Sequence, residues 1–123
     1  MTEVNYFEKE GVTVVVLLEP TLIKDVAVQE IRRNIEELLT QHGVTKLLVD
    51  FRCVTLAGSA TLGMLIRVKS KCASRGCRLA LCGLQPPVRE TFRITQLDKI
   101  FEIYDDIEPG IAALQSSVES DGG

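Results

Sequence analysis

The chain has 123 residues, of which 46% are hydrophobic and 25% charged, and its formal net charge at pH 7 is −3. This length and composition are typical of one globular domain and exclude an intrinsically disordered chain. The acidic balance, with a pI near 5.2, argues against a domain that holds nucleic acid. No apolar run approaches the ~20 residues that cross a bilayer, and the first residues lack a signal-peptide pattern, so we expect a cytoplasmic domain without membrane insertion.

The first predicted elements are the two strands of a β-hairpin. Residues Asn5–Glu8 and Val12–Leu18 flank a turn at Gly11, and the second strand carries the apolar run of a strand buried on both faces. The more polar first strand is expected at the edge of the sheet. A one-sided apolar stripe then predicts a helix from about Asp25 to His42. The stripe consists of Val28, Ile31, Ile35, Leu38 and Leu39.

A second buried strand, a loop and a second long helix follow. The strand spans Lys46–Asp50, the loop spans Phe51–Gly58, and the helix runs from about Ala60 to Ser74. A third buried strand is predicted over Arg78–Cys82. The inner face of the second helix is expected to hold Leu62, Leu65, Ile66, Cys72 and Ala73.

The last third of the chain predicts two short helices around one short strand. Pro86 opens a helix anchored by Val88 and Phe92, Ile100–Ile103 is a strand, and Asp106 caps the last helix. The elements run in the order ββαβαβαβα. This order predicts an α/β fold with a mixed, mostly parallel sheet, an N-terminal β-hairpin at its edge and about four helices.

Four cysteines, at positions 53, 72, 77 and 82, suggest a metal site or disulfides at first sight. Cys77 and Cys82 bracket a predicted strand, however. Their odd separation puts them on opposite faces and roughly 16 Å apart at ~3.3 Å per residue. Neither a disulfide nor one tetrahedral zinc ion can join them. We therefore expect buried, reduced thiols and no metal.

Two features lie where the strands of such a sheet end, which is where functional groups gather. One is Asp50, which we expect to cap loop amides or to pair with Arg52. The other is Ser59, expected to be the N-cap of the second long helix, with its hydroxyl accepting from the amide of Thr61 or Leu62. A phosphate there would add about −1.5 to −2 charges at the positive end of the helix dipole. The alternative is that Ser59 is only a cap.

The segment Leu47–Leu65, which reads LLVDFRCVTLAGSATLGML, resembles the core of STAS domains, the sulphate transporter and anti-sigma factor antagonist family. Two later stretches, Gly76–Leu84 and Ile103–Ile107, fit the same family in order and spacing. The resemblance covers roughly residues 4–116. It implies a STAS domain over residues 1–116, and we expect residues 117–123 to be a disordered polar tail.

Stand-alone members of this family act in partner switching that regulates transcription. The resemblance implies that the unphosphorylated chain binds an anti-sigma factor, which is also a serine kinase with an ATPase fold, and so releases a sigma factor. Phosphorylation of a serine at the start of the second helix breaks the complex, and a serine phosphatase resets it. The matching position here is Ser59.

The motif departs from the family pattern at two positions. The family reads Asp-Ser-Ser/Ala-Gly-Leu-Gly, whereas this chain has Gly58 in place of the acid and Thr61 in place of the first glycine. The missing carboxylate puts phosphorylation in doubt more than the fold. Thr61 is a second candidate acceptor.

The partner surface is expected around Ser59. Met64 is expected to be partly exposed there, with ordinary core as the alternative. The predicted partner-binding residues are Leu56, Ala57, Gly58, Ser59, Ala60, Thr61, Met64, Lys24 and Asp25.

Enzymatic readings fit the sequence poorly. A phosphoacceptor receiver domain needs further carboxylates to hold Mg²⁺, but the place after the first buried strand reads Glu19-Pro20. A serine hydrolase needs a nucleophile elbow, but Ala57–Thr61 is not G-x-S-x-G, and the one histidine, His42, lies far upstream. We therefore predict no catalytic activity and no cofactor. The alternative that stays open is a phosphorylation-independent STAS scaffold or sensor module in a signalling or lipid-transport complex.

Overall fold

A computed structural model describes residues 4–116 of the chain. Its main sheet has five strands in the order β1-β2-β4-β6-β7. The strands are β1 (Asn5–Lys9), β2 (Val12–Val16), β4 (Lys46–Asp50), β6 (Arg78–Cys82) and β7 (Glu102–Tyr104). The hairpin partner β1 is antiparallel to β2, and every other pairing is parallel. The predicted mixed sheet with a hairpin at its edge is confirmed.

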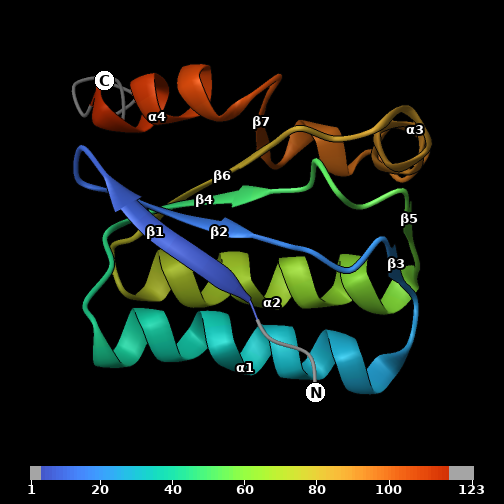
Figure 1. The fold of residues 1–123 in the computed structure, drawn as a ribbon, viewed down its shortest axis with the longest axis horizontal. Coiled ribbons are helices and arrows are strands. Elements are labelled where there is room, and N and C mark those ends of the chain that lie inside the picture. The colour runs from blue at the N-terminus through green and yellow to red at the C-terminus, as the bar shows by residue number, and fades with distance from the viewer. Residues whose placement is uncertain (1–3, 117–123) are drawn as a thin grey trace.

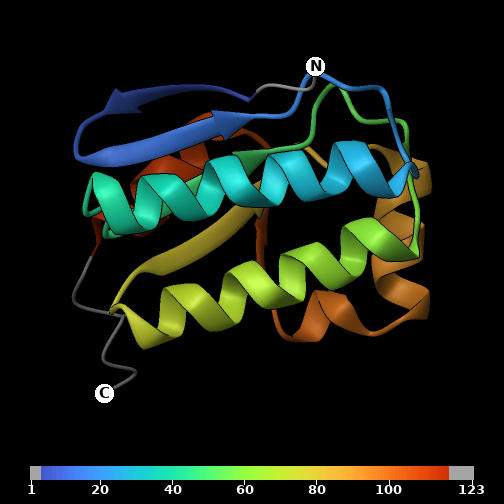
Figure 2. The same ribbon diagram turned by 90° about the horizontal axis from the view of Figure 1, so that it is seen from below.

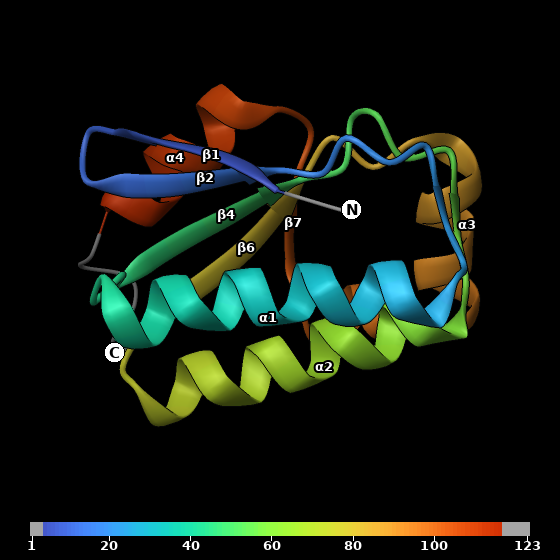
Figure 3. The same ribbon diagram turned by 60° about the horizontal axis from the view of Figure 1, so that its bottom comes forward.

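Helices cover both faces of this sheet. The long helices α1 (Asp25–Gln41) and α2 (Ser59–Ser74) lie side by side under one face, and α4 (Ile107–Gln115) covers the other (Figures 1 and 2). The short helix α3 (Pro86–Ile94) packs at the end of the molecule where α1 and α2 begin (Figure 3). The chain thus forms three layers, with the sheet in the middle.

The core is divided into two clusters by the sheet, because neighbouring strand residues point to opposite faces. On β4, Leu47 and Val49 join the large cluster against α1, α2 and α3, whereas Leu48 joins the small cluster under α4. The α4 layer sits close to the sheet: a Cβ added at Gly110 would lie 2.9 Å from a methyl carbon of Leu48. A larger residue at Gly110 would push α4 away from β4.

The buried stripe of α1 is as predicted, whereas the inner face of α2 is not. The buried residues of α2 are Thr61, Met64, Leu65, Val68 and Cys72. Ile66 is 45% exposed and Ala73 is also exposed, so their predicted burial was wrong. The reason is that α2 packs against α1 as well as the sheet. Packing against this second neighbour turns the buried stripe by roughly a quarter of a turn, at 3.6 residues per turn.

The structure adds two strands to the predicted elements and moves the start of another. Two short strands, β3 (Thr21–Leu22) and β5 (Leu56–Ala57), pair in parallel within segments predicted to be loops. The last strand begins at Glu102 rather than Ile100, because a 3₁₀ turn over Leu97–Lys99 ends at Ile100. The cap of α4 is as predicted, with an Asp106 carboxylate oxygen accepting from the Ile107 amide at 2.7 Å. The predicted disordered tail, residues 117–123, lies outside the described residues.

Within residues 4–116, no helix combines the length and apolar character needed to cross a bilayer.

Candidate functional site

The two-stranded pairing of β3 with β5 fixes the place where α1 and α2 begin. Thr21 pairs with Leu56 and Leu22 with Ala57. Hydrogen bonds extend the pairing, with the Gly58 amide donating to the Leu22 carbonyl oxygen at 2.9 Å. The two strands descend together from the sheet to the helix layer (Figure 3). The first turns of both long helices are therefore held next to each other.

Ser59 is the first residue of α2, and its side chain is exposed. The predicted N-cap role is wrong, because Gly58 occupies the N-cap position with extended backbone (φ −99°, ψ −175°). The Gly58 carbonyl oxygen accepts from the amides of Thr61 (3.0 Å) and Leu62 (3.2 Å). The first amides of a helix have no acceptor within the helix, so this terminus is electropositive. The Ser59 hydroxyl faces solvent at that terminus.

Thr61 lies on the opposite, inner side of the first turn of α2. Its side chain is fully buried, and its hydroxyl donates to the Leu22 carbonyl oxygen at 2.6 Å. The prediction of Thr61 as a second phosphate acceptor is therefore wrong for the folded chain. A kinase would have to pull the helix start off β3 to reach this hydroxyl.

The predicted partner residues divide into exposed and buried groups. Met64 is 1% exposed, so its predicted partial exposure was wrong; it packs in the core between the helices and the sheet. Ala57 also packs in the core. Leu56 is 49% exposed, and Lys24 and Asp25 are exposed at the start of α1.

Two exposed apolar residues at the start of α1 were not predicted from the sequence. Ile23 is 52% exposed and Val26 is 72% exposed. Ile23 lies against Gly58, where an added Cβ would sit 3.1 Å from the Ile23 Cγ2 atom. Val26 could have been found, because it precedes Val28 by two positions and so falls opposite the buried stripe of its helix. We call the following set the Ser59 surface: the exposed residues Ile23, Val26, Leu56 and Ser59, together with the half-buried Gly58 and Ala60.

Asp50 is a structural group at the end of β4. Its carboxylate is 3% exposed and accepts from the Arg52 amide at 3.0 Å and from the Cys82 thiol at 3.8 Å. The predicted capping of a loop amide is confirmed, whereas the Arg52 guanidinium pairs with Asp106 instead. Gly83 has φ +71°, and an added Cβ there would lie 2.7 Å from the Asp50 Oδ1 atom. Only glycine fits at this position.

His42 lies far from Ser59. It follows the last residue of α1 and its ring contacts Tyr6 at 6.5 Å between centroids. Ser59 lies where the two long helices begin, and α1 has 17 residues, or about 25 Å at 1.5 Å per residue. The imidazole therefore cannot act as a base for the Ser59 hydroxyl.

Comparisons with known proteins agree with this architecture. The family model described as "STAS domain" matches residues 3–109. A crystal structure of a putative anti-sigma factor antagonist from Thermotoga maritima superposes with a TM-score of 0.79 at 20% identity, covering 91% of this chain and 94% of that chain. An anti-sigma factor antagonist from Mycobacterium paratuberculosis gives 0.81 at 21% identity, covering 93% and 94%.

The phosphorylated form of the Bacillus cell fate determinant SpoIIAA is also similar. Its TM-score is 0.69 at 20% identity, covering 90% of this chain and 98% of that chain. At these identities the three structures establish a common fold.

Proposed function

Since the chain belongs to the STAS domain family, we propose that it is an anti-sigma factor antagonist switched by phosphorylation of Ser59. In its unphosphorylated form it binds an anti-sigma factor with serine kinase activity, and a sigma factor is released. Phosphate on Ser59 ends this complex, and a serine phosphatase removes the phosphate. The chain is the kinase's substrate and not an enzyme.

The observation that carries the proposal is the exposed Ser59 side chain at the first position of α2, bordered by exposed apolar side chains. Ile23 and Leu56 are each about half exposed. Exposed apolar residues beside an accessible hydroxyl suit a surface that a partner covers and a kinase can reach. Thr61, the other hydroxyl in this turn, is not accessible.

Charge explains how one phosphate can break a complex without unfolding the chain. A phosphoserine carries about −1.5 to −2 charges. The N-terminus of α2 stabilises an anion through its dipole and free amides, so the fold tolerates the group. A partner that covers Ile23 and Leu56 would have to desolvate the same dianion. Burying an unpaired charge is expensive, so the complex dissociates.

Having Gly58 in place of the family's acid makes the Ser59 surface more apolar. The backbone at Gly58 is extended and suits any residue, so its conformation does not require glycine. Its missing side chain instead leaves room for Ile23. The usual acid would crowd Ile23 and add a negative charge next to Ser59.

The same glycine favours the second candidate function, a phosphorylation-independent STAS scaffold or sensor. If a kinase needs the acid to orient the serine, this chain would bind its partner through the Ser59 surface without being switched. The two functions share the docking surface and differ in whether Ser59 is modified.

The test is capture from the native lysate on immobilised wild type and the variants Ser59→Ala, Ser59→Glu and Ser70→Glu. Ser70 is an exposed serine further along α2, so it controls for the added charge. We expect a serine-kinase-like ATPase on every bait except Ser59→Glu. The recovered ATPase, given ATP, should phosphorylate wild type at Ser59 and leave Ser59→Ala unmodified. Equal capture by all four baits, with no phosphate on Ser59, would favour the scaffold.

A further inference from the structure

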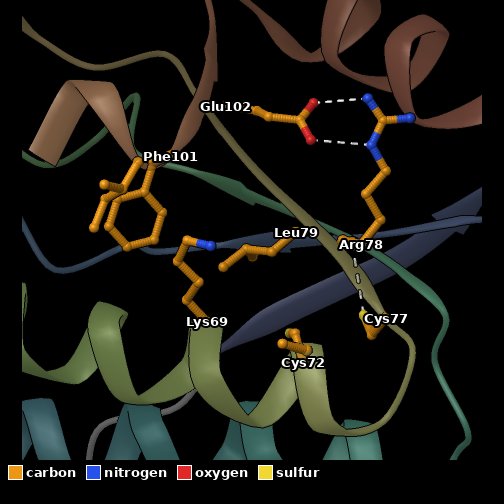
Figure 4. Close-up of a pocket in the computed structure, with 9 residues that line it drawn as sticks. Lys69, Cys72, Cys77, Arg78, Leu79, Phe101 and Glu102 are labelled. Atoms are coloured by element: carbon orange, nitrogen blue, oxygen red, sulfur yellow. Dashed lines mark hydrogen bonds and ion pairs between the residues drawn. The ribbon is translucent and has the colours of Figure 1, made fainter. Parts of the chain in front are cut away.

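The C-terminal end of α2 brings two cysteines together. The Cys77 amide donates to the Cys72 carbonyl oxygen at 2.8 Å, and the Gly76 amide donates to that of Ala73 at 3.4 Å. Gly76 has φ +71°. These bonds define a Schellman motif, which places the side chains of its first and last residues in contact. Here both residues are cysteines (Figure 4).

The two side chains lie close enough to influence each other's ionisation in the reduced chain. The Cys77 thiol also donates to the Arg78 carbonyl oxygen at 3.6 Å. A hydrogen bond from Cys72 stabilises a thiolate on Cys77, so the pKa of Cys77 is lowered and that of Cys72 is raised. Cys77 is also the more exposed of the two residues, at 7% against 2%, so accessibility and ionisation both favour it as the nucleophile.

A pocket gives small molecules access to the pair. Cys72 and Cys77 are only 2% and 7% exposed, yet both line a pocket of about 190 Å³. A water molecule takes up roughly 30 Å³ in the liquid, so a molecule the size of hydrogen peroxide fits easily. Lys69 on α2 and the ion pair of Arg78 with Glu102 form the polar wall of the pocket (Figure 4). The positive charge of Lys69 partly offsets the rise in the pKa of Cys72.

The other two cysteines have different surroundings. Cys82 lies in the cluster under α4, on the opposite face of the sheet from Cys77, as predicted. Burial raises its pKa to about 12, so it stays a thiol. Cys53 is exposed in the loop after β4, which corrects the prediction that all four are buried. Among the described residues, Cys72 and Cys77 are therefore the pair that can react with each other.

We propose that Cys72 and Cys77 form a redox modification site, which hydrogen peroxide converts to an intramolecular disulfide. The Cys77 sulphur attacks one peroxide oxygen and the O–O bond breaks. Water is released as the leaving group, and Cys77 becomes a sulfenic acid. The Cys72 sulphur then attacks Cys77, the S–O bond breaks, and a second water leaves as the S–S bond forms. Two thiols lose two electrons and two protons, and one peroxide becomes two waters. The product links the last turn of α2 to the residue that precedes β6.

The test is oxidation of the reduced full-length chain with hydrogen peroxide, followed by alkylation, intact mass and a non-reduced tryptic map. Cleavage after Arg75 separates the two cysteines, so a disulfide between them appears as two linked peptides. We expect a loss of two hydrogens and this linked pair, in wild type and equally in the control Cys53→Ser. Cys72→Ser should stop at a sulfenic acid on Cys77 that dimedone traps, whereas Cys77→Ser should give no adduct at position 72.

Three results would overturn the proposal. In the first, oxidised wild type carries alkylated Cys72 and Cys77, with modification confined to Cys53. In the second, dimedone labels Cys72 in Cys77→Ser as fast as it labels Cys77 in Cys72→Ser. In the third, the only disulfides join two chains. The wild-type map decides the question even if a buried cysteine variant fails to fold.

Discussion

The hydroxyl of Thr61 in α2 donates to the carbonyl oxygen of Leu22 in β3 at 2.6 Å. The same carbonyl oxygen accepts from the Gly58 amide at 2.9 Å. One acceptor thus binds the N-cap residue and the first turn of α2 to the strand that leads into α1. The Ser59 surface keeps its shape because both of its helices are tied to this point.

Thr61→Val should destabilise the chain, because it removes a buried hydrogen bond while keeping the side chain's shape. We expect a loss of about 1–2 kcal/mol in the free energy of unfolding by urea, with the m-value unchanged. Thr40→Val is the matched control, since the Thr40 hydroxyl bonds to its own helix at an exposed site. An equal loss in the two variants would argue against the tie between α2 and β3.

Ser59→Glu should leave stability unchanged or raise it by up to about 1 kcal/mol, because a negative charge at a helix N-terminus interacts favourably with the dipole. Gln41→Glu puts the same charge at the last residue of α1, where no basic residue lies in the last turn, and should have the opposite sign. Both effects should shrink in salt. A large destabilisation by Ser59→Glu in urea unfolding would contradict the proposed tolerance for phosphate.

Gly83→Ala should be among the most damaging single substitutions. The positive φ and the contact with the Asp50 carboxylate together predict a loss of at least about 2 kcal/mol. Gly63→Ala is the control: nothing lies within 4 Å of its added Cβ, and alanine in an exposed helical turn should gain about 1 kcal/mol. Thermal or urea unfolding of the two variants should therefore give shifts of opposite sign.

Ile23→Ser and Leu56→Ser should weaken binding of the partner proposed above by about tenfold or more. They should change stability little, because both side chains are half exposed. Ile94→Ser is the control, since Ile94 is 67% exposed on α3, outside the Ser59 surface. Titration calorimetry with the recovered partner measures the effect. If Ile94→Ser weakened binding as much as the other two, the docking surface would extend over α3.

Glu102→Gln should remove part of the chain's acid sensitivity. A hydrogen bond from Arg78 lowers the pKa of Glu102 below its ordinary 4.5, and a hydrogen bond from Tyr104 adds a smaller effect in the same direction. A carboxyl whose pKa is lower in the folded state stabilises the fold above its unfolded pKa, and this contribution disappears as pH falls through the folded pKa. The variant should be less stable near pH 7, by under about 1 kcal/mol because the pair is partly exposed. The difference should vanish in strong acid, as followed by urea unfolding across pH.

The sequence predicted well those elements in which apolar residues recur with one clear period. The stripe of α1 was predicted residue by residue, because α1 buries one face only. The strands β3 and β5 were missed, because a two-residue strand is too short to show alternation. Met64 and Thr61 were misplaced on the surface, because the neighbouring helix α1, which sequence periodicity does not reveal, turns α2 about its axis.

Ser59 was predicted to be the N-cap of α2, but it is the first residue of the helix. A serine before a helix favours the N-cap assignment, but the preceding glycine takes that role through its backbone carbonyl. The apolar part of the Ser59 surface was harder to predict. Ile23 joins it only through the pairing of β3 with β5, a contact between segments more than 30 residues apart in sequence.

The strand β1 also bears on how the chain behaves at high concentration. It borders the sheet, and no other strand of the described part pairs with its outer edge. An open edge is a template on which strands of neighbouring molecules can assemble. Here that edge is five residues long and ends in charged Glu8 and Lys9, with Lys9 held by Glu108 of α4 at 2.8 Å. Fibre-like stacking of one copy on the next is thereby discouraged.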